Sequence, residues 1–146
     1  MAVWQNSPAP TPNLAPSHGL AEDLKVAVAT VAVTTALAAA DTINFFELPD
    51  GAVIHSARLQ PSTPLDTNGA PTLTLNVGWS GSAAALYSAS TGLQSLAGDS
   101  NPLFAGLETQ LLGSTLIFGT VQAAGATKAA GSVRLRVEYT VEGHPS

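Results

Sequence analysis

The final stretch of the chain alternates strictly between apolar and polar residues. Val133, Leu135 and Val137 alternate with Arg134 and Arg136. Because successive side chains of a strand point to opposite faces, this period of two predicts a strand with one buried face. Similar alternation recurs along the chain between turns rich in Gly, Pro, Asn and Asp. It predicts strands over residues 24–33, 41–47, 52–60, 71–78, 115–122 and 131–142.

Several short strands without a long amphipathic helix are typical of a β-sandwich or jelly roll. An α/β fold would need several helices of about ten residues or more, and the alanine-rich run at 35–40 is too short to be one. We therefore predict an all-β fold, either a β-sandwich or a jelly roll. Its predicted core comprises Val28, Ile43, Phe45, Leu73, Leu75, Val77, Phe118, Leu135, Val137 and Tyr139.

Residues 78–113 carry the weakest strand pattern in the chain. Ser, Ala and Gly dominate the segment, with scattered Leu and the aromatic residues Trp79, Tyr87 and Phe104. We expect a long excursion from the sheets that contains one short helical turn around Ala83–Tyr87. A loop of this length is uncommon unless it is functional or packed against other structure.

The first 22 residues differ in composition from the remainder. Pro8, Pro10, Pro12 and Pro16 fix the backbone angle φ and lack amide donors, which favours an extended, polyproline-like segment. We predict two parts, an extended N-terminal arm at 1–22 and a single all-β domain at 23–146.

The predicted arm is a candidate partner-binding segment, because it carries a tryptophan near its tip. Tryptophan is costly to leave exposed and is enriched at interface hot spots. The alternative is a tail that binds nothing. The residues predicted to contact a neighbouring chain are Val3, Trp4, Pro8, Pro10, Pro12 and Leu14.

Only 10% of the 146 residues are charged, against about 25% in an average domain. A surface with so few charges dissolves poorly alone, which indicates that much of it meets other protein. The net charge of −5 and five scattered basic residues argue against a nucleic-acid partner. No apolar stretch approaches the ~18 residues of a membrane helix, so we expect no membrane partner. Residues 1–16 lack the basic and apolar regions of a secretory signal.

Candidate catalytic and metal-binding groups are sparse. Without cysteine, the chain can hold no disulfide, thiolate zinc site or cysteine nucleophile. His55 shares strand parity with Val53 and Leu59, which predicts a structural histidine facing the sheet interior or a subunit contact. Neither a G-x-S-x-G motif nor a phosphate-binding glycine loop occurs. We expect no enzyme activity, no cofactor and no metal site.

Residues 66–69 have the sequence Asp-Thr-Asn-Gly, which partly resembles a calcium loop. A complete loop also needs a bidentate glutamate, and none follows within residues 70–78. We therefore expect an Asx-type turn between two strands.

Five segments of the sequence carry a recognisable pattern: AADTI at 39–43, LPDGAVI at 48–54, LDTNGAPTLTLNVG at 65–78, AAGSV at 129–133 and VEYTV at 137–141. Together they resemble small structural proteins of tailed bacteriophages, and the resemblance extends over about residues 24–142. These proteins are associated with the capsid as decoration or cement subunits.

The resemblance implies a β-sandwich or jelly-roll subunit, often trimeric, on the outside of the virion capsid. Such a subunit is made in the host cytoplasm and binds the major capsid protein and its own copies. It carries no catalytic residues. Two alternatives stay open: a phage tail, connector or head-fibre-base protein, and a carbohydrate-binding β-sandwich that would use Trp79, Tyr87 and Phe104.

Overall fold

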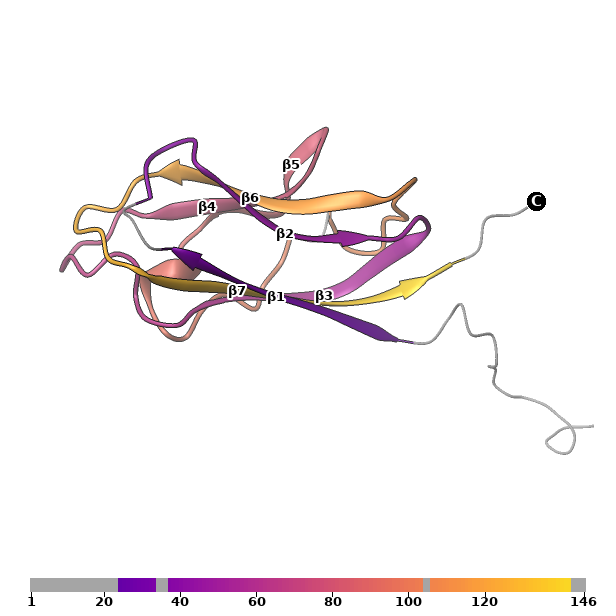
Figure 1. The fold of residues 1–146 in the computed structure, drawn as a ribbon, viewed down its shortest axis with the longest axis horizontal. Helices are drawn as coiled ribbons and strands as arrows, with labels where there is room; N and C mark the ends of the chain where they lie inside the picture. Colours follow the sequence, from indigo (N-terminus) through magenta and orange to yellow (C-terminus); the bar gives the residue numbers. More distant parts are fainter. Residues whose placement is uncertain (1–23, 34–36, 104–105, 143–146) are drawn as a thin grey trace, which may run out of the picture.

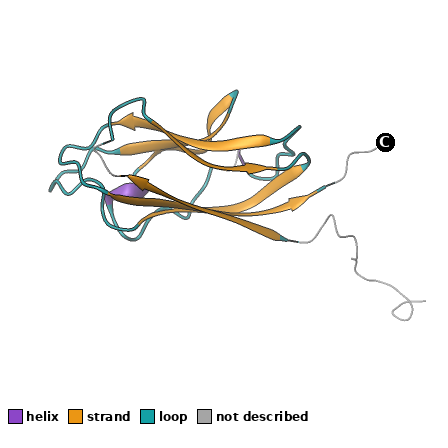
Figure 2. Ribbon diagram, in the orientation of Figure 1, coloured by secondary structure: helices purple, strands orange, loops and turns teal. Residues whose placement is uncertain are grey.

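The chain folds into two antiparallel sheets that pack face to face, as the computed structural model shows (Figures 1 and 2). The structure describes residues 24–33, 37–103 and 106–142. This confirms the predicted all-β fold and identifies it as a β-sandwich. The strands in this part of the chain are β1 (Lys25–Val33), β2 (Thr42–Leu48), β3 (Ala52–Pro61), β4 (Thr74–Trp79), β5 (Ser82–Ser90), β6 (Thr115–Ala123) and β7 (Gly131–Val141), and a 3₁₀-helix, η2 (Gly92–Gln94), follows β5.

One sheet has the strand order β1-β7-β3 and the other has the order β2-β6-β4-β5. The chain therefore changes sheets between β1 and β2, β2 and β3, β3 and β4, and β6 and β7. At the β2–β3 crossing, the Ala52 N–H donates to the Pro49 carbonyl (3.2 Å), which closes a tight turn. Gly51 adopts φ +87°, and a Cβ there would collide with the Glu142 carbonyl, so glycine suits this crossing.

The core lies between the two sheets and follows the alternation of the sequence. In β7, Val133, Leu135 and Val137 are fully buried, and the intervening Arg134 is exposed. Seven of the ten predicted core residues are buried: Ile43, Phe45, Leu73, Leu75, Val77, Leu135 and Val137.

The other three predicted core residues are not buried. Val28 is 46% exposed, because in β1 the side chains of Ala27, Ala29 and Val31 pack against the core instead. Phe118 is half-buried on the outer face of β6, because the neighbouring Ile117 takes the inner position. Tyr139 is half-buried and packs against the edge of the core. Strands β1 and β6 carry apolar residues on both faces, so alternation alone could not identify the inner face of either strand.

Residues 78–113 contain more regular structure than the sequence indicated. The expected helical turn at 83–87 is wrong: these residues lie in β5, with Leu86 and Tyr87 buried. Alanine and serine have weak strand preference, but β5 pairs with β4 in a hairpin, and this tertiary pairing overrides local preference.

The described residues that follow η2, 95–103 and 106–110, form a covering segment along the free edge of β3. Asp99 and Leu59 exchange backbone hydrogen bonds of 2.7 and 2.9 Å, and the Glu108 N–H donates to Ile54 (2.9 Å). The Tyr87 hydroxyl secures the same region by donating to the carbonyls of Asp99 (2.8 Å) and Ala57 (3.1 Å). A covered edge cannot pair with another chain.

Asp66 anchors the loops at the end of the sandwich where β3 ends and β4 begins. The residue is 2% exposed, and its carboxylate accepts backbone N–H bonds of 2.7 to 3.2 Å. Burial opposes ionisation, but these donors outweigh it and hold the pKa of Asp66 well below its usual range. The bond from Asn68 confirms the expected Asx turn. The five donors are the backbone amides of Asn68, Thr72, Leu73, Ala126 and Thr127.

We expect Leu135→Ala to lower the free energy of unfolding by about 2–5 kcal/mol, because the side chain is fully buried between the sheets. Val28→Ala is the control, with an expected change within about 0.5 kcal/mol, since Val28 is exposed. Denaturant unfolding of both variants measures the difference. Equal losses would contradict the assigned inner face of β1.

We expect Asp66→Asn to lower the free energy of unfolding by about 1–3 kcal/mol at pH 7, because an amide cannot accept all five bonds. The pKa of Asp66 is lower in the folded protein, so its contribution is complete above about pH 4 and is lost as the pH falls towards the folded pKa. The difference between wild type and variant should therefore narrow at pH 3. An unchanged difference would mean that the ionised carboxylate is not the stabilising form.

Candidate interaction site

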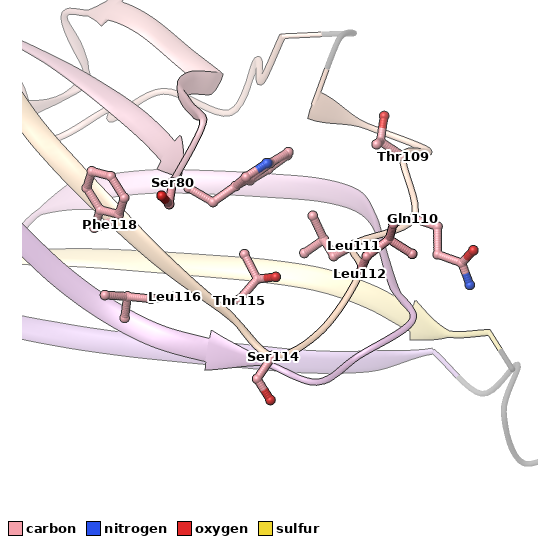
Figure 3. A pocket seen from close by; sticks show the side chains of 10 residues that line it. Ser80, Thr109, Gln110, Leu111, Leu112, Ser114, Thr115, Leu116 and Phe118 are labelled. Carbon is pink, nitrogen blue, oxygen red and sulfur yellow. The ribbon is translucent and has the colours of Figure 1, made fainter. Parts of the chain in front are cut away.

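A groove of about 490 Å³ lies at the end of the sandwich where β6 begins. Three segments line it: the β4–β5 hairpin, the loop at 109–114 and the first residues of β6 (Figure 3). None of the lining side chains is ionisable, so the groove suits an uncharged ligand. The lining residues are Trp79, Ser80, Thr109, Gln110, Leu111, Leu112, Ser114, Thr115, Leu116 and Phe118.

The loop at 109–114 is fixed by hydrogen bonds to the β2–β3 turn. The Leu111 N–H donates to Ala52 (2.8 Å), and the Gly51 N–H donates to Leu111 (2.9 Å). The Gly113 N–H donates to Asp50 Oδ1 (2.7 Å). These bonds direct Leu111 into the core, where it is 4% exposed, and leave the following Leu112 78% exposed beside the groove.

The outer face of β6 supplies the rest of the apolar lining. Leu116 is 39% exposed and Phe118 is half-buried, and both side chains lie on the face opposite the buried Ile117. Figure 3 shows both of them in the lining of the groove. Phe118 lies opposite Gly78 in the pairing of β6 with β4. A Cβ at Gly78 would collide with the backbone of Ser82 and Ala83, so glycine allows the β4–β5 hairpin to fold tightly beside the groove.

A second apolar surface runs along β1. Leu24, Val26 and Val28 are 59%, 48% and 46% exposed, which is unusual for three alternate residues. Strand β1 pairs with β7 along one edge, and no strand within the described residues pairs with its other edge. Residues 26–33 contain no charged side chain that would discourage pairing with another chain.

His55 links the covering segment to the three-stranded sheet. Its Nδ1 lies 2.7 Å from Glu108 Oε2 and its Nε2 lies 2.9 Å from Thr140 Oγ1. A register shift between Ile54 and Ser56 places the ring beside Thr140 on the outer face of the sheet, so the interior alternative is wrong, and the alternative of a subunit contact stays a prediction. Both ring nitrogens have partners, which agrees with the predicted structural role. Glu108 adopts φ +62°, an unfavourable angle that this contact and its backbone bond to β3 stabilise.

A polar cluster beside His55 crosses from β3 to β7. The Ser56 hydroxyl donates to Glu138 Oε1 (2.7 Å), and Arg136 Nη1 lies 3.0 Å from Glu138 Oε2. The hydroxyl of Ser56 and the guanidinium of Arg136 lower the pKa of Glu138. Neither cluster lines the groove. Neither cluster lines the second depression of the surface, which is formed by Thr30, Gln60, Pro61, Ser62, Ser132 and Arg134. Both connect elements of the fold.

Among the described residues, no group of His, Cys, Asp and Glu could hold a metal ion. The helices of the described chain also include none that is long and apolar enough to cross a membrane.

The predicted partner-binding residues Val3, Trp4, Pro8, Pro10, Pro12 and Leu14 lie outside the described residues. Of the three aromatic residues considered for a sugar site, Tyr87 is buried in the core, Phe104 is outside the described residues, and Trp79 lines the groove.

Sequence analysis missed the groove. The sequence contains two signals of this groove. One is the pair Leu111-Leu112 before Gly113, and the other is the run Leu116-Ile117-Phe118, which places apolar residues on both faces of β6.

Three solved capsid structures contain a chain similar to this one. The cyanophage Pam1 capsid asymmetric unit has a chain with 38% identity and a TM-score of 0.76, and the match covers 94% of this chain and 98% of that chain. The capsid of Ralstonia phage GP4 has one with 28% identity and a TM-score of 0.77, covering 90% and 93%. The acidic stable capsid structure of Helicobacter pylori bacteriophage KHP30 has one with 17% identity and a TM-score of 0.53, covering 82% and 89%, which shows the fold alone. No protein-family model and no curated protein matches the chain.

We expect Gly78→Ala to lower the free energy of unfolding by about 1–3 kcal/mol, because the added methyl group collides with the β5 backbone. Gly69→Ala is the control: an added Cβ there meets no atom within 4 Å, and the change should stay within about 0.5 kcal/mol. Denaturant unfolding measures both. A Gly78→Ala variant as stable as the wild type would contradict the close approach of β5 at this position.

Proposed function

Since this chain belongs to a family of bacteriophage capsid structural proteins, we propose that it is a decoration, or cement, subunit. It binds the outside of the shell formed by the major capsid protein and stabilises that shell. The observation that supports this most is the match over 98% of a chain within the Pam1 capsid asymmetric unit. The matched chain of the Pam1 capsid is therefore about as long as this one, as expected for a separate subunit that binds to a shell.

The charge of the chain supports a position on the outer surface. Its net charge is −5, and only five of its residues are Lys or Arg. Packaged DNA is a dense polyanion, and a protein that meets it needs clustered cations to neutralise phosphates. An acidic subunit avoids this repulsion on the outside of the shell.

The polar clusters support a structural role. His55 stands between the Glu108 carboxylate and the Thr140 hydroxyl, an arrangement that superficially resembles a catalytic triad. However, His55 and Thr140 line neither the groove nor the depression beside Arg134, where a substrate could be enclosed. Capsid structural proteins act by binding, and the contacts of His55 hold the covering segment on β3.

The open edge of β1 supports association with further copies of the chain, for which we propose a homotrimer. Val26 and Val28 lie exposed on this strand and Leu24 lies exposed immediately before it, and burying these side chains would remove apolar surface from water. A trimer that spans several capsid subunits binds multivalently. Each contact can then be modest while the loss of any one stays reversible.

The Pro-rich arm is proposed to add a contact with a neighbouring chain through Val3, Trp4, Pro8, Pro10, Pro12 and Leu14. Prolines restrict the free segment, so less conformational entropy is lost when it binds.

To test the function, purified protein is added to phage heads that lack it, and bound copies are counted and imaged. We expect the bound copies to cover the outer surface, with a copy number that matches the number of equivalent sites on the capsid lattice. We also expect the heads to release their DNA at a higher temperature. A few copies confined to one vertex would support the connector or head-fibre alternative. Retention of the protein on a glycan column without binding to heads would support the carbohydrate-binding alternative.

We expect deletion of residues 2–16 to weaken binding to heads by about thirtyfold or more, because a buried tryptophan typically contributes about 2 kcal/mol or more. Titration of the variant against heads measures occupancy. The variant should keep the thermal unfolding of the full chain, since the described core begins beyond this segment. Unchanged occupancy and unchanged head stability would leave attachment to the sandwich alone.

A further inference from the structure

We propose that the groove between the β4–β5 hairpin and β6 receives the Pro-rich N-terminal arm of a second copy of this chain. The groove is lined by Trp79, Leu112, Leu116 and Phe118 among others. The arm supplies Trp4 and the prolines that follow it. This inference rests on the proposed function in one respect, that the subunit assembles in several copies.

The groove and the arm match in chemistry. Extended Pro-rich segments bind aromatic-lined grooves, where the pyrrolidine rings pack against aromatic faces and the preformed conformation limits the entropy lost. The groove provides Trp79 and Phe118 for such packing, with the hydroxyl groups of Ser80 and Ser114 available to the backbone carbonyls of a bound segment.

Charge distinguishes the arm from the other end of the chain. Residues 1–17 contain no Asp, Glu, Lys, Arg or His, and the groove lining contains none either. Residues 142–146 include Glu142 and His144. Burying a charged group against an apolar lining costs free energy unless it is paired, so residues 1–17 of the arm, which have no ionisable side chain, are the better ligand.

The arm precedes β1, and β1 starts at the end of the sandwich where the groove lies. Lys25, at the start of β1, pairs with Tyr139 near the end of β7. At this same end, Gln110 of the groove donates to the Glu142 carbonyl (3.2 Å). Figure 1 shows β1 starting beside the end of β7.

The length of the arm favours a second copy over the chain's own groove. In polyproline conformation, the stretch from Trp4 to Leu24 spans about 60 Å at roughly 3.1 Å per residue. The longest strand, β7, has 11 residues and extends only about 36 Å at roughly 3.3 Å per residue. An extended arm therefore carries Trp4 beyond its own sandwich and into the reach of a neighbour.

Engineered disulfides test this directly, because the chain contains no cysteine. Asn6→Cys is introduced into an affinity-tagged full chain and Ser114→Cys into an untagged one, and the two are co-expressed and mildly oxidised. We expect disulfide-linked pairs of tagged and untagged chains on a non-reducing gel. The control replaces Ser114→Cys by Gln122→Cys, which lies near the far end of β6.

The pair at Asn6 and Ser114 should cross-link on the order of tenfold more than the control pair, because a docked arm holds its thiol at an effective concentration near the mM range. Equal yields at the two positions would overturn the proposal. So would a chain with both cysteines that forms only an internal disulfide, since the arm would then occupy its own groove.

A second variant tests the apolar lining of the groove with the same cysteine pair in place. Leu116→Asp places a charge in the lining, and Leu103→Asp is its matched control, since the two leucines are 39% and 40% exposed. With the cysteine pair present, Leu116→Asp should reduce the cross-link about tenfold, while Leu103→Asp should leave it unchanged. Equal effects of the two variants would overturn the role of the groove.

Both measurements use purified full chains without phage heads. Loss of the cross-link with normal binding to heads would overturn this inference and leave the proposed function intact. A strong cross-link in a protein that does not bind heads would do the reverse.

Discussion

Strand β7 pairs with β1 along one edge and with β3 along the other, so the three-stranded sheet is held together through this one strand. Its inward residues Val133, Leu135 and Val137 are fully buried. Its outward residues Glu138 and Thr140 receive the polar contacts of Ser56 and His55 from β3. Both faces of β7 therefore stabilise the fold, the inner face by burying apolar surface and the outer face by hydrogen bonding. The bond from Thr140 holds His55, which in turn contacts Glu108 of the covering segment.

The sequence predicted the fold class, six of the strands and most of the core, because the alternation of apolar and polar residues persists wherever one face is buried. It failed where that contrast disappears. Val28 lies in a strand that is apolar on both faces, and β5 is built from alanine and serine, whose own preference for strands is weak. His55 sits at a register shift, which local alternation cannot reveal.

The site was less predictable than the fold. The resemblance of short segments to phage structural proteins indicated a capsid protein, and the similarity to chains of phage capsids agrees with it at that level. The groove, however, combines a hairpin with a loop and a strand that follow it by about thirty residues in the sequence, and only the tertiary fold brings them together. Leu112 and Leu116 were undistinguished apolar residues until the structure placed them on the outside.

The contrast between the two edges of the three-stranded sheet bears on the life of the free subunit. The edge of β3 is covered by the segment around Asp99 and Glu108, whereas no strand among the described residues pairs with the outer edge of β1, where residues 26–33 carry no charge. An unpaired strand edge is a template for pairing with another chain when subunits accumulate. The covered edge of β3 cannot pair in this way, so the three-stranded sheet can be extended only from β1. The segment that covers β3 therefore prevents this sheet from growing at both edges into a continuous ribbon of subunits.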